Sequence, residues 1–310
     1  MDLVASLQKK ITSLDSGEYL PGLKAVLLHI ETAFRHLSRG QDSDDDTAFT
    51  DAIYRTNQAF EGSIKEAYRV LADQDPAHKR PYDIESYLEK GNVFRKRVLS
   101  QFTTYRTDWR NPSAHDYKLD FDESEAFLAI VSVTAFACLL LDQIAERLAF
   151  NKSKAEAEAQ KQKLAGAFDT SLDVYKRTVS VILEFCRNHM PINNALAITE
   201  VQMIGSLHGF FASAAPDLTT QVDVAIGTPG NYRVDLTISS QGVMIPVEVK
   251  RSYRPDHMSS AIQQVFKYTE LSNASNGILL CLPTMQSEMV VDDVISTTSD
   301  THIAVIRPKA

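Results

Sequence analysis

The sequence predicts a two-domain protein in which an N-terminal antiparallel helical bundle precedes an α/β domain built on a mixed central sheet. Its 310 residues exceed the roughly 100 to 200 residues of a single domain. Apolar residues recur at spacings of three and four until about residue 165, as one face of a helix requires. Short β-branched runs of alternating polarity then appear between helical segments. We therefore expect a helical domain over residues 1–150, a charged helical connector over 151–170 and a sheet domain over 171–310.

Four helices are expected in the N-terminal domain. The first carries the apolar positions from Leu23 to Leu37 and ends at the acidic loop of residues 41–46. The others are expected at residues 50–71, at 84–102, and from a cap at Asp122 or Ser124 to beyond Arg147. A loop containing the segment Arg110 to His115 is expected to lead into the fourth helix. The short connections predict antiparallel neighbours and hence a bundle.

The connector and the sheet domain follow from a change of pattern. Residues 151–162 read NKSKAEAEAQKQ, which is polar on every face and predicts a solvated helix. Helices are then expected at 172–185, 193–211 and 259–273, and strands at 221–226, 232–238, 243–250, 277–282 and 303–306. The order α-β-β-β-α-β predicts a mixed sheet with helices on its faces.

Composition limits the classes of function. The net charge is 32 minus 40, or −8, so the chain is not coated with positive charge, although a phosphate-handling enzyme needs only a few placed cations. The three cysteines show no zinc-ligand spacing, which favours a reducing compartment. The longest apolar stretch, Phe127 to Leu141, is shorter than the roughly 20 residues that span a bilayer. We expect a cytoplasmic protein without membrane association.

Two carboxylates and an amine are expected to converge on one hairpin. The spacing of two puts Glu248 and Lys250 on the same face of their strand. If the preceding turn centres on Ser240 and Gln241, Asp235 lies within diagonal reach of Glu248 across the ladder. Paired carboxylates hold one or two Mg²⁺ ions, and a lysine beside them orients or activates water for phosphodiester hydrolysis. Glu200, on the helix before the sheet, would complete the metal shell.

These residues carry a family resemblance. Glu200, Arg233-Val-Asp235, Glu248-Val-Lys250 and Gln264-Val-Phe-Lys-Tyr268 resemble the PD-(D/E)XK restriction-endonuclease-like superfamily over residues 193–282. The resemblance implies that Glu200, Asp235 and Glu248 bind Mg²⁺ or Mn²⁺, that Lys250 serves catalysis, and that Gln264 and Tyr268 support the site or the nucleic acid. Val234 departs from the family's name-giving proline. The alternative interpretation is a solvated, non-functional set of surface charges.

A second motif lies in the N-terminal domain. Arg110-Asn-Pro-Ser-Ala-His115, ahead of a long apolar helix, resembles the R-polar-x3-H motif of the HEPN superfamily, over residues 20–150. That family implies a homodimer with a composite, metal-independent RNA-cleaving site. Arg110 would stabilise charge on the phosphate, His115 would exchange protons with the ribose hydroxyl or the leaving oxygen, and Asn111 would orient them. Alternatively, Arg110 pairs with Asp108 or Asp116, and His115 caps the next helix.

Together the two resemblances predict a nuclease, most simply an endonuclease of a prokaryotic antiphage or abortive-infection type. The C-terminal domain would hydrolyse DNA with Mg²⁺, and the N-terminal domain would dimerise and cut RNA. One alternative is a metal-independent RNase whose C-terminal domain only binds nucleic acid. Another is a non-catalytic assembly subunit of a defence or repair complex. The expected partners are DNA or RNA, a second copy of the chain and a regulatory protein.

Overall fold

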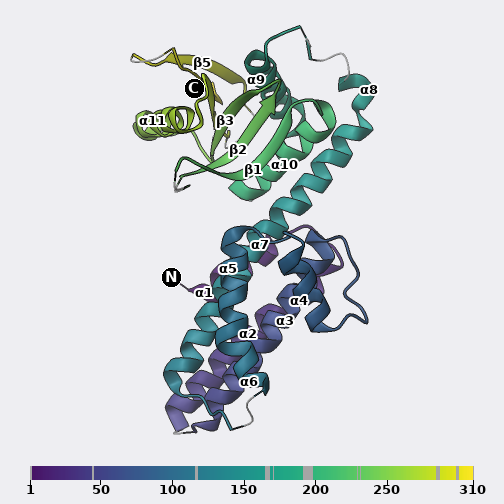
Figure 1. Cartoon of the computed structure of the whole chain (residues 1–310), viewed down its shortest axis with the longest axis vertical. Coiled ribbons are helices and arrows are strands. Elements are labelled where there is room, and N and C mark those ends of the chain that lie inside the picture. Colours follow the sequence, from purple (N-terminus) through teal and green to yellow (C-terminus); the bar gives the residue numbers. More distant parts are fainter. Residues whose placement is uncertain are drawn as a thin grey trace. The chain divides into compact units, whose positions relative to one another are not determined.

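The computed structural model describes residues 2–43, 45–115, 118–164, 168–169, 171–190, 198–228, 230, 232–283, 287–297 and 300–309. The chain forms two compact units, Met1–Ala145 and Glu146–Ala310, called here the N-terminal and C-terminal units (Figure 1). The division falls slightly before the predicted end of the helical domain at residue 150. An N-terminal helical region and a C-terminal mixed sheet are both present, as the sequence predicted.

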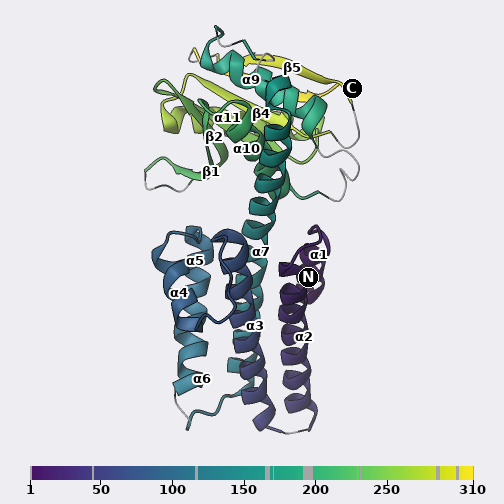
Figure 2. The same ribbon diagram turned by 90° about the vertical axis from the view of Figure 1, so that its right-hand side faces the viewer.

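All the regular secondary structure described in the N-terminal unit is helical. Its helices are α1 Leu3–Thr12, α2 Tyr19–Ser43, α3 Thr47–Leu71, α4 Pro81–Lys90, α5 Lys96–Tyr105, α6 Asn111–His115 and the first part of α7 Glu123–Ala159. In both views α2, α3 and this part of α7 run alongside one another (Figures 1 and 2). Phe60 of α3 stacks on Phe102 and Tyr105 and contacts Phe136 of α7, so an aromatic core joins α3, α5 and α7.

Three predictions for this unit were wrong. Helix α1, Leu3–Thr12, was not among the four expected helices. The helix expected at 84–102 is divided into α4 and α5, because Gly91 ends α4 and Asn92 adopts the left-handed φ of 51°. The segment expected as a loop is helical: a π-helix, Arg106–Arg110, continues α5 and leads directly into α6. A change from α- to π-type hydrogen bonding leaves no periodic signal in the sequence.

The start of α7 confirms the predicted cap. The Asp122 side chain accepts a hydrogen bond from the Glu125 N–H at 2.8 Å, and the Glu125 side chain accepts one from the Asp122 N–H at 2.9 Å. Among the described residues, α7 is the one helix long and apolar enough to cross a membrane by length and composition, and half of that apolar window is buried in the structure.

The predicted connector is not solvated on all faces. Residues 151–159 form the end of α7, where Ser153 and Ala157 are buried. Helix α10, Glu200–Ala214, packs against this part of α7 through two glycines. A Cβ at Gly205 would strike the Glu146 carbonyl, and one at Gly209 would strike the Phe150 carbonyl. The sequence did not predict this contact, because the buried residues of the connector, Ser153 and Ala157, are small and form no apolar pattern.

The C-terminal unit is built on a six-stranded sheet of order β1-β2-β3-β4-β6-β5. The strands are β1 Thr219–Ile226, β2 Tyr232–Ser240, β3 Val243–Lys250, β4 Asn276–Cys281, β5 Met289–Ile295 and β6 His302–Pro308. The pairs β3-β4 and β4-β6 are parallel and the others antiparallel, which confirms the mixed sheet. Strand β5 was not predicted, because as an edge strand it buries few of its side chains.

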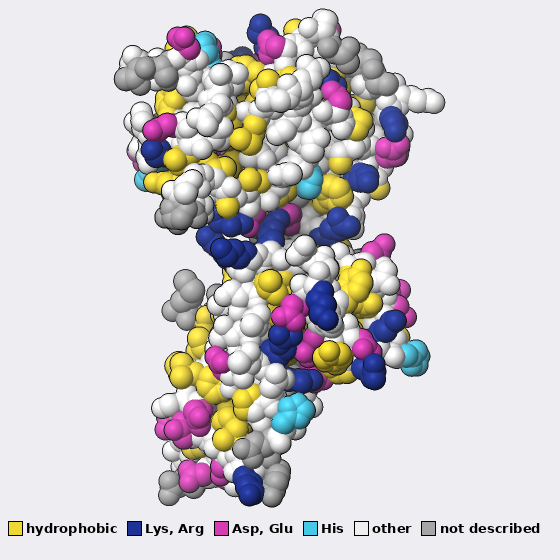
Figure 3. Space-filling view, in the orientation of Figure 1, with side chains coloured by type: hydrophobic (Ala, Val, Ile, Leu, Met, Phe, Trp, Pro, Cys, Tyr) yellow, Lys and Arg dark blue, Asp and Glu magenta, His cyan; other side chains and the backbone are white. Residues whose placement is uncertain are grey.

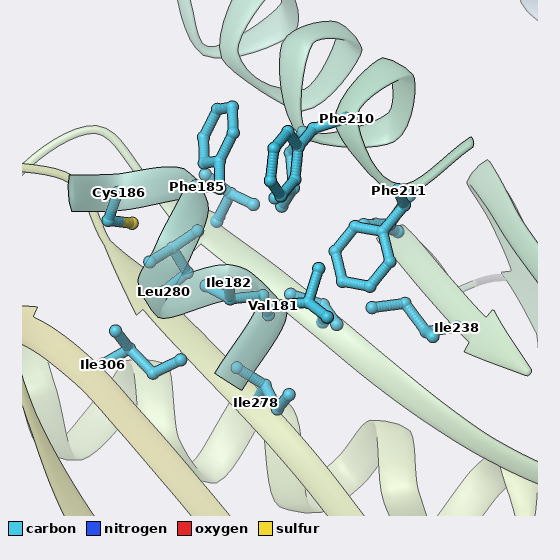
Figure 4. Packing of buried hydrophobic residues seen from close by; sticks show 14 of the residues in the cluster. Val181, Ile182, Phe185, Cys186, Phe210, Phe211, Ile238, Ile278, Leu280 and Ile306 are labelled. Atoms are coloured by element: carbon cyan, nitrogen blue, oxygen red, sulfur yellow. The ribbon is translucent and has the colours of Figure 1, made fainter. Parts of the chain in front are cut away.

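Helices cover both faces of this sheet. Besides α10, they are α9 Val174–Glu184 with a π-helix at Phe185–His189, and α11 Pro255–Ser272; the short α8 Lys161–Leu164 contacts α10. Residues 191–197, in which the second predicted helix of the domain would start, lie outside the described residues. On one face, aromatic side chains of the α9 and α10 region, such as Phe185 and Phe210, pack over Ile278 and Leu280 (Figure 4). On the other, α11 packs against Leu279 and Cys281. Strand β4 is therefore buried on both faces.

The surface carries both signs of charge. On the face shown in Figure 3, both basic and acidic side chains are visible among larger areas of uncharged surface. The net charge of the whole chain is −8. Any interaction with phosphate groups must therefore depend on a few placed side chains.

Candidate functional site

The hairpin of β2 and β3 brings the two predicted carboxylates together. Ser240 pairs with Val243, so the turn residues are Gln241 and Gly242, with φ of 50° and 80°. The turn expected at Ser240 and Gln241 was therefore wrong, because positive φ at both central positions is what the twist of a two-residue hairpin requires. The register, which pairs Leu236 with Val247, places Asp235 directly across from Glu248 rather than diagonal to it.

Strands β2 and β3 stop pairing at this point. The Asp235 carboxylate takes the place of a backbone acceptor: its Oδ2 accepts a hydrogen bond from the Val249 N–H at 2.8 Å. The bond satisfies a backbone donor of β3 and fixes the Asp235 side chain beside Glu248. Beyond this point the two strands diverge, and side chains rather than backbone hydrogen bonds connect them.

Glu248 is buried and only partly paired. It is 4% exposed, and its Oε1 accepts a hydrogen bond from the Lys250 ammonium at 2.5 Å. Its other oxygen, Oε2, is buried without a hydrogen-bond partner. A buried carboxylate oxygen without a partner is costly, and an added cation is one way to satisfy it.

The pKa values of Asp235 and Glu248 also favour the addition of a cation or a proton. Burial and the neighbouring Asp235 carboxylate raise the pKa of Glu248 to about 7. Burial also raises the pKa of Asp235. Burial lowers the pKa of Lys250, but its hydrogen bond to Glu248 and the nearby carboxylates outweigh this effect and raise it. The site therefore combines an ammonium whose pKa is raised with two carboxylates that repel each other unless a cation or proton is added.

Helix α11 completes the arrangement around Lys250. The Lys250 ammonium donates to Gln264 Oε1 at 3.2 Å, and Gln264 Nε2 donates to the Tyr268 hydroxyl at 2.5 Å. Gln264 and Tyr268 are one helical turn apart, so both reach the same point of the sheet. Tyr268 is 4% exposed and packs against Val234 of β2. The structure thus joins Lys250, Gln264 and Tyr268, as the motif predicted.

Glu200 approaches the cluster from another element. It is the first residue of α10, whose N-terminus is fixed by a capping box between Thr199 and Gln202. Burial raises the pKa of Glu200, and the Asp235 carboxylate raises it further. Within the described residues, no group of three or more His, Cys, Asp or Glu side chains is arranged to hold a metal ion. The role of Glu200 as a third metal ligand therefore stays a prediction.

The carboxylate pair by itself fits a divalent cation. Mg²⁺ commonly binds through one or two carboxylates and keeps several of its waters. Asp235 and Glu248 supply two carboxylates at adjacent strand positions, and Glu248 Oε2 is an acceptor without a protein partner. Carboxylate oxygens are the ligands that a hard cation prefers, and Glu248 Oε2 is an acceptor that such a cation would satisfy.

Asp223 of β1 is a neighbour that the sequence did not identify. It lies across β2 from Glu248, opposite Asp235 in register, with an unusual φ of 55°. Arg233 donates to the Asp223 carboxylate at 2.5 Å and to its carbonyl at 2.6 Å. The Asp223 charge also raises the pKa of Asp235. Only the strand register could have revealed it, since Asp223 belongs to no recognised motif.

The N-terminal motif has a different arrangement. Arg110 ends the π-helix, and its guanidinium lies 3.6 Å from Glu85 Oε1, lies 3.9 Å from Glu61 Oε1 and donates to Asn111 Oδ1 at 3.1 Å. The alternative of pairing with Asp108 is not seen in the described part of the chain, and Asp116 lies outside it. Glu61 and Glu85, the partners found, come from α3 and α4 and gave no sequence signal.

His115 ends α6 and is exposed. Within the described residues, no hydrogen bond or ion pair joins it to Arg110. It does not cap α7 either, because Asp122 does, so that alternative was wrong. The segment between the two motif residues is firmly held: Ser113 accepts a hydrogen bond from Asn57 at 2.7 Å, and Asn57 accepts one from the buried Tyr105 at 2.9 Å.

The raised pKa of Glu248 makes a prediction about pH. Folding favours its protonated form, so this stability is fully present below the ordinary pKa of 4.5 and is lost as pH rises through about 7. In a chelator, the unfolding free energy of the wild type relative to Glu248→Gln should therefore fall between about pH 5 and 8, by at most ~1.4 kcal/mol per pH unit. Urea unfolding across this range measures the difference. A constant difference would show that Glu248 titrates normally.

Comparison with known proteins adds no relative. No family model, no curated protein and no solved structure matches the chain. Both resemblances therefore depend on the motif residues and their geometry. The C-terminal cluster has the stronger geometric support, because residues of β2, β3 and α11 that are far apart in sequence meet there through hydrogen bonds.

Proposed function

We propose that the C-terminal unit is a divalent-metal-dependent phosphodiesterase of the PD-(D/E)XK type that cleaves nucleic acid, with DNA as its favoured substrate. The observation that carries the proposal is the position of Asp235 directly across from Glu248, whose Oε2 is buried without a hydrogen-bond partner. Lys250 bonds only the other oxygen of Glu248, so Oε2 is left for a proton shared with Asp235 or for a cation.

Each residue has a role in this proposal. Asp235 and Glu248 would hold Mg²⁺ or Mn²⁺, with Glu200 as a further ligand. The chemistry that such an ion supplies is polarisation of the phosphate and a lowered pKa of water. Lys250, whose pKa is raised, stays an ammonium and so donates hydrogen bonds to water or phosphate oxygens rather than abstracting a proton. Gln264 holds that ammonium in place, and Tyr268 holds the Gln264 amide.

A cleavage assay tests the proposal. Labelled single- and double-stranded DNA and RNA are incubated with the full chain, with Mg²⁺ and with a chelator. We expect product from DNA in Mg²⁺ and none in the chelator. Absence of product from every substrate in Mg²⁺ and Mn²⁺ would instead favour a non-catalytic assembly subunit. The association with antiphage defence follows from the families alone and needs a separate test in infected cells.

RNA cleavage by the N-terminal unit is a second candidate function, in which the C-terminal unit would only bind nucleic acid. The observation in its favour is a π-helix directly at the motif, held by a buried hydrogen-bond network through Asn57 and Tyr105. Functional sites often contain such π-helical turns. Because Glu61 and Glu85 already balance Arg110 within one chain, activity would need a second copy to bring the two motifs together.

This candidate predicts RNA cleavage that resists a chelator. His115→Ala should reduce it by about 10²-fold or more, since a positioned general acid or base contributes that much. His78→Ala is the matched control, because His78 is also an exposed histidine of the N-terminal unit. Gel analysis of RNA products measures both rates. Equal rates for the two variants would exclude His115 from the chemistry.

A further inference from the structure

The carboxyl ends of the parallel strands β3, β4 and β6 lie side by side at one edge of the sheet. Lys250, at the end of β3, pairs with Cys281 of β4. Arg307 of β6 reaches the same level, because the pair just before it is Leu280 with Ile306. Lys250, Cys281 and Arg307 thus form one row across three strands. In open α/β sheets, ligands commonly bind outside such carboxyl ends.

The two cations of this row lie on the same face of the sheet. Val305, two residues before Arg307, packs against α11, and side chains two apart share a face. The Lys250 ammonium also contacts α11, through Gln264. Burial raises the pKa of the Cys281 thiol to about 11, and the charges of Lys250 and Arg307 oppose this shift, so both lie near it. Two strand spacings separate their backbones by roughly 10 Å.

The Arg307 guanidinium is held in one orientation. Its Nε donates to Asp292 Oδ2 of β5 at 2.6 Å, and its Nη1 donates to the Pro308 carbonyl at 3.3 Å. Its central carbon lies 5.2 Å from the centroid of the Tyr253 ring. The side chain is 22% exposed, and no bond to another described residue uses Nη2. A fixed, accessible fork of this kind loses little freedom when it binds an anion.

Further positive charge lies between Lys250 and α11. Arg251 and Arg254 belong to the segment that joins β3 to α11, and both are exposed. Burial and the Asp235 charge raise the pKa of Glu200, and Lys250 and Arg251 oppose this shift, so Arg251 lies near the candidate metal ligands. A strand of phosphates at this edge would therefore meet several cations rather than one.

We propose that Arg307 binds a phosphate of the substrate strand next to the one that is cleaved. The inference rests on the proposed function, because it places cleavage at the carboxylate pair and Lys250. Arg307 lies two strands from Lys250 at the same level, and its planar fork suits two oxygens of one phosphate. Asp292 and Tyr253 keep the fork in place. Arg307 therefore contributes to substrate binding and takes no part in the chemical step.

Equilibrium binding of fluorescent single-stranded and duplex DNA to the full chain, in a chelator, tests this inference without cleavage. Arg307→Gln should weaken binding about tenfold, as loss of a hydrogen bond to a charged group does. It should also reduce the slope of log Kd against log salt by about 0.7 for the single strand or 0.9 for the duplex, which is the contribution of one phosphate contact. With Mg²⁺, KM should rise by a similar factor while kcat is kept.

Two further variants serve as controls. Arg177 of α9 also pairs with an aspartate, Asp217, but α9 covers the other face of the sheet, so Arg177→Gln should change neither affinity nor slope. Arg307→Lys should keep the slope, because the charge remains, and thermal melting confirms that each variant folds.

The outcomes separate this inference from the proposed function. Wild-type protein that binds DNA but cleaves none in Mg²⁺ or Mn²⁺, with a reduced salt slope in Arg307→Gln, would contradict the phosphodiesterase and still support phosphate binding by Arg307. An Arg307→Gln protein with wild-type affinity and slope overturns the inference, whether or not DNA is cleaved. Absence of DNA binding by the wild type overturns it as well.

Discussion

Lys250→Met is expected to lower the rate of Mg²⁺-dependent phosphodiester cleavage by about 10²- to 10⁴-fold, with little change in substrate affinity. A positioned donor acting on developing charge contributes this much in other enzymes. The Lys250 ammonium is placed for that role, because Glu248 and Gln264 hold it from two sides at 2.5 and 3.2 Å. Methionine keeps the unbranched shape and most of the length of the side chain and removes the terminal ammonium with its charge and donors.

Lys267→Met is the matched control. Lys267 lies on α11 near the site but pairs with Glu270 at 2.8 Å, and so should leave the rate unchanged. Asp235→Asn adds an independent test, since the amide oxygen can still accept from the Val249 N–H while the charge is lost. Initial rates with labelled DNA, together with thermal melting to confirm folding, measure all three. A Lys250→Met protein that cuts at the wild-type rate would remove this residue from the mechanism.

Gly209→Ala is expected to destabilise the C-terminal unit by about 2–3 kcal/mol, although glycine to alanine in a helix interior normally stabilises by up to about 1 kcal/mol. The added methyl group would meet only backbone atoms of α7: the Phe150 carbonyl and the Lys154 nitrogen. Backbone cannot rotate away, so α10 would have to shift. Because α10 begins at Glu200, the same shift would disturb the candidate site.

Gly62→Ala provides the contrast. Gly62 is also inside a long helix, but its added methyl group would meet a single atom, a Val26 methyl at 2.9 Å, which can rotate aside. This variant should therefore be nearly neutral. Urea unfolding followed by far-ultraviolet circular dichroism measures both changes, and Trp109 fluorescence follows the N-terminal unit separately. Equal effects of the two substitutions would contradict the close approach of α7 and α10.

The candidate site shows which of its contacts the spacing of residues in the sequence predicted. A period of two correctly placed Glu248 and Lys250 together, with Val247 and Val249 on the opposite, fully buried face. The i, i+4 spacing correctly grouped Gln264 and Tyr268. The relation of Asp235 to Glu248 depended on which two residues form the turn, and positive φ at Gln241, a residue other than glycine or asparagine, could not be foreseen.

Elements without strong local patterns were the ones missed. Gly91 and Asn92 divide a helix whose apolar spacing continues through them. The π-helix at Arg106–Arg110 has the composition of an ordinary loop or helix. Edge strand β5 alternates only weakly, because one side of the strand faces solvent and its pairing with β6 is long-range. For β5 the deciding interaction lies outside the window over which periodicity can be measured, whereas Gly91 and Asn92 act locally and interrupt the helix without changing its apolar spacing.

The sequence alone determined the division into a helical and a mixed α/β region, the shared face of Glu248 and Lys250 on β3, and the residue types that meet at the candidate site. These are local properties, set by side-chain period and by the donors that a residue carries. Tertiary structure alone decided that Asp235 faces Glu248, that a carboxylate oxygen stays unpaired, that Glu61 and Glu85 lie beside Arg110, and that residues of α2 and α3 line an open pocket. Such relations depend on register and packing between distant segments, which no single stretch of sequence contains.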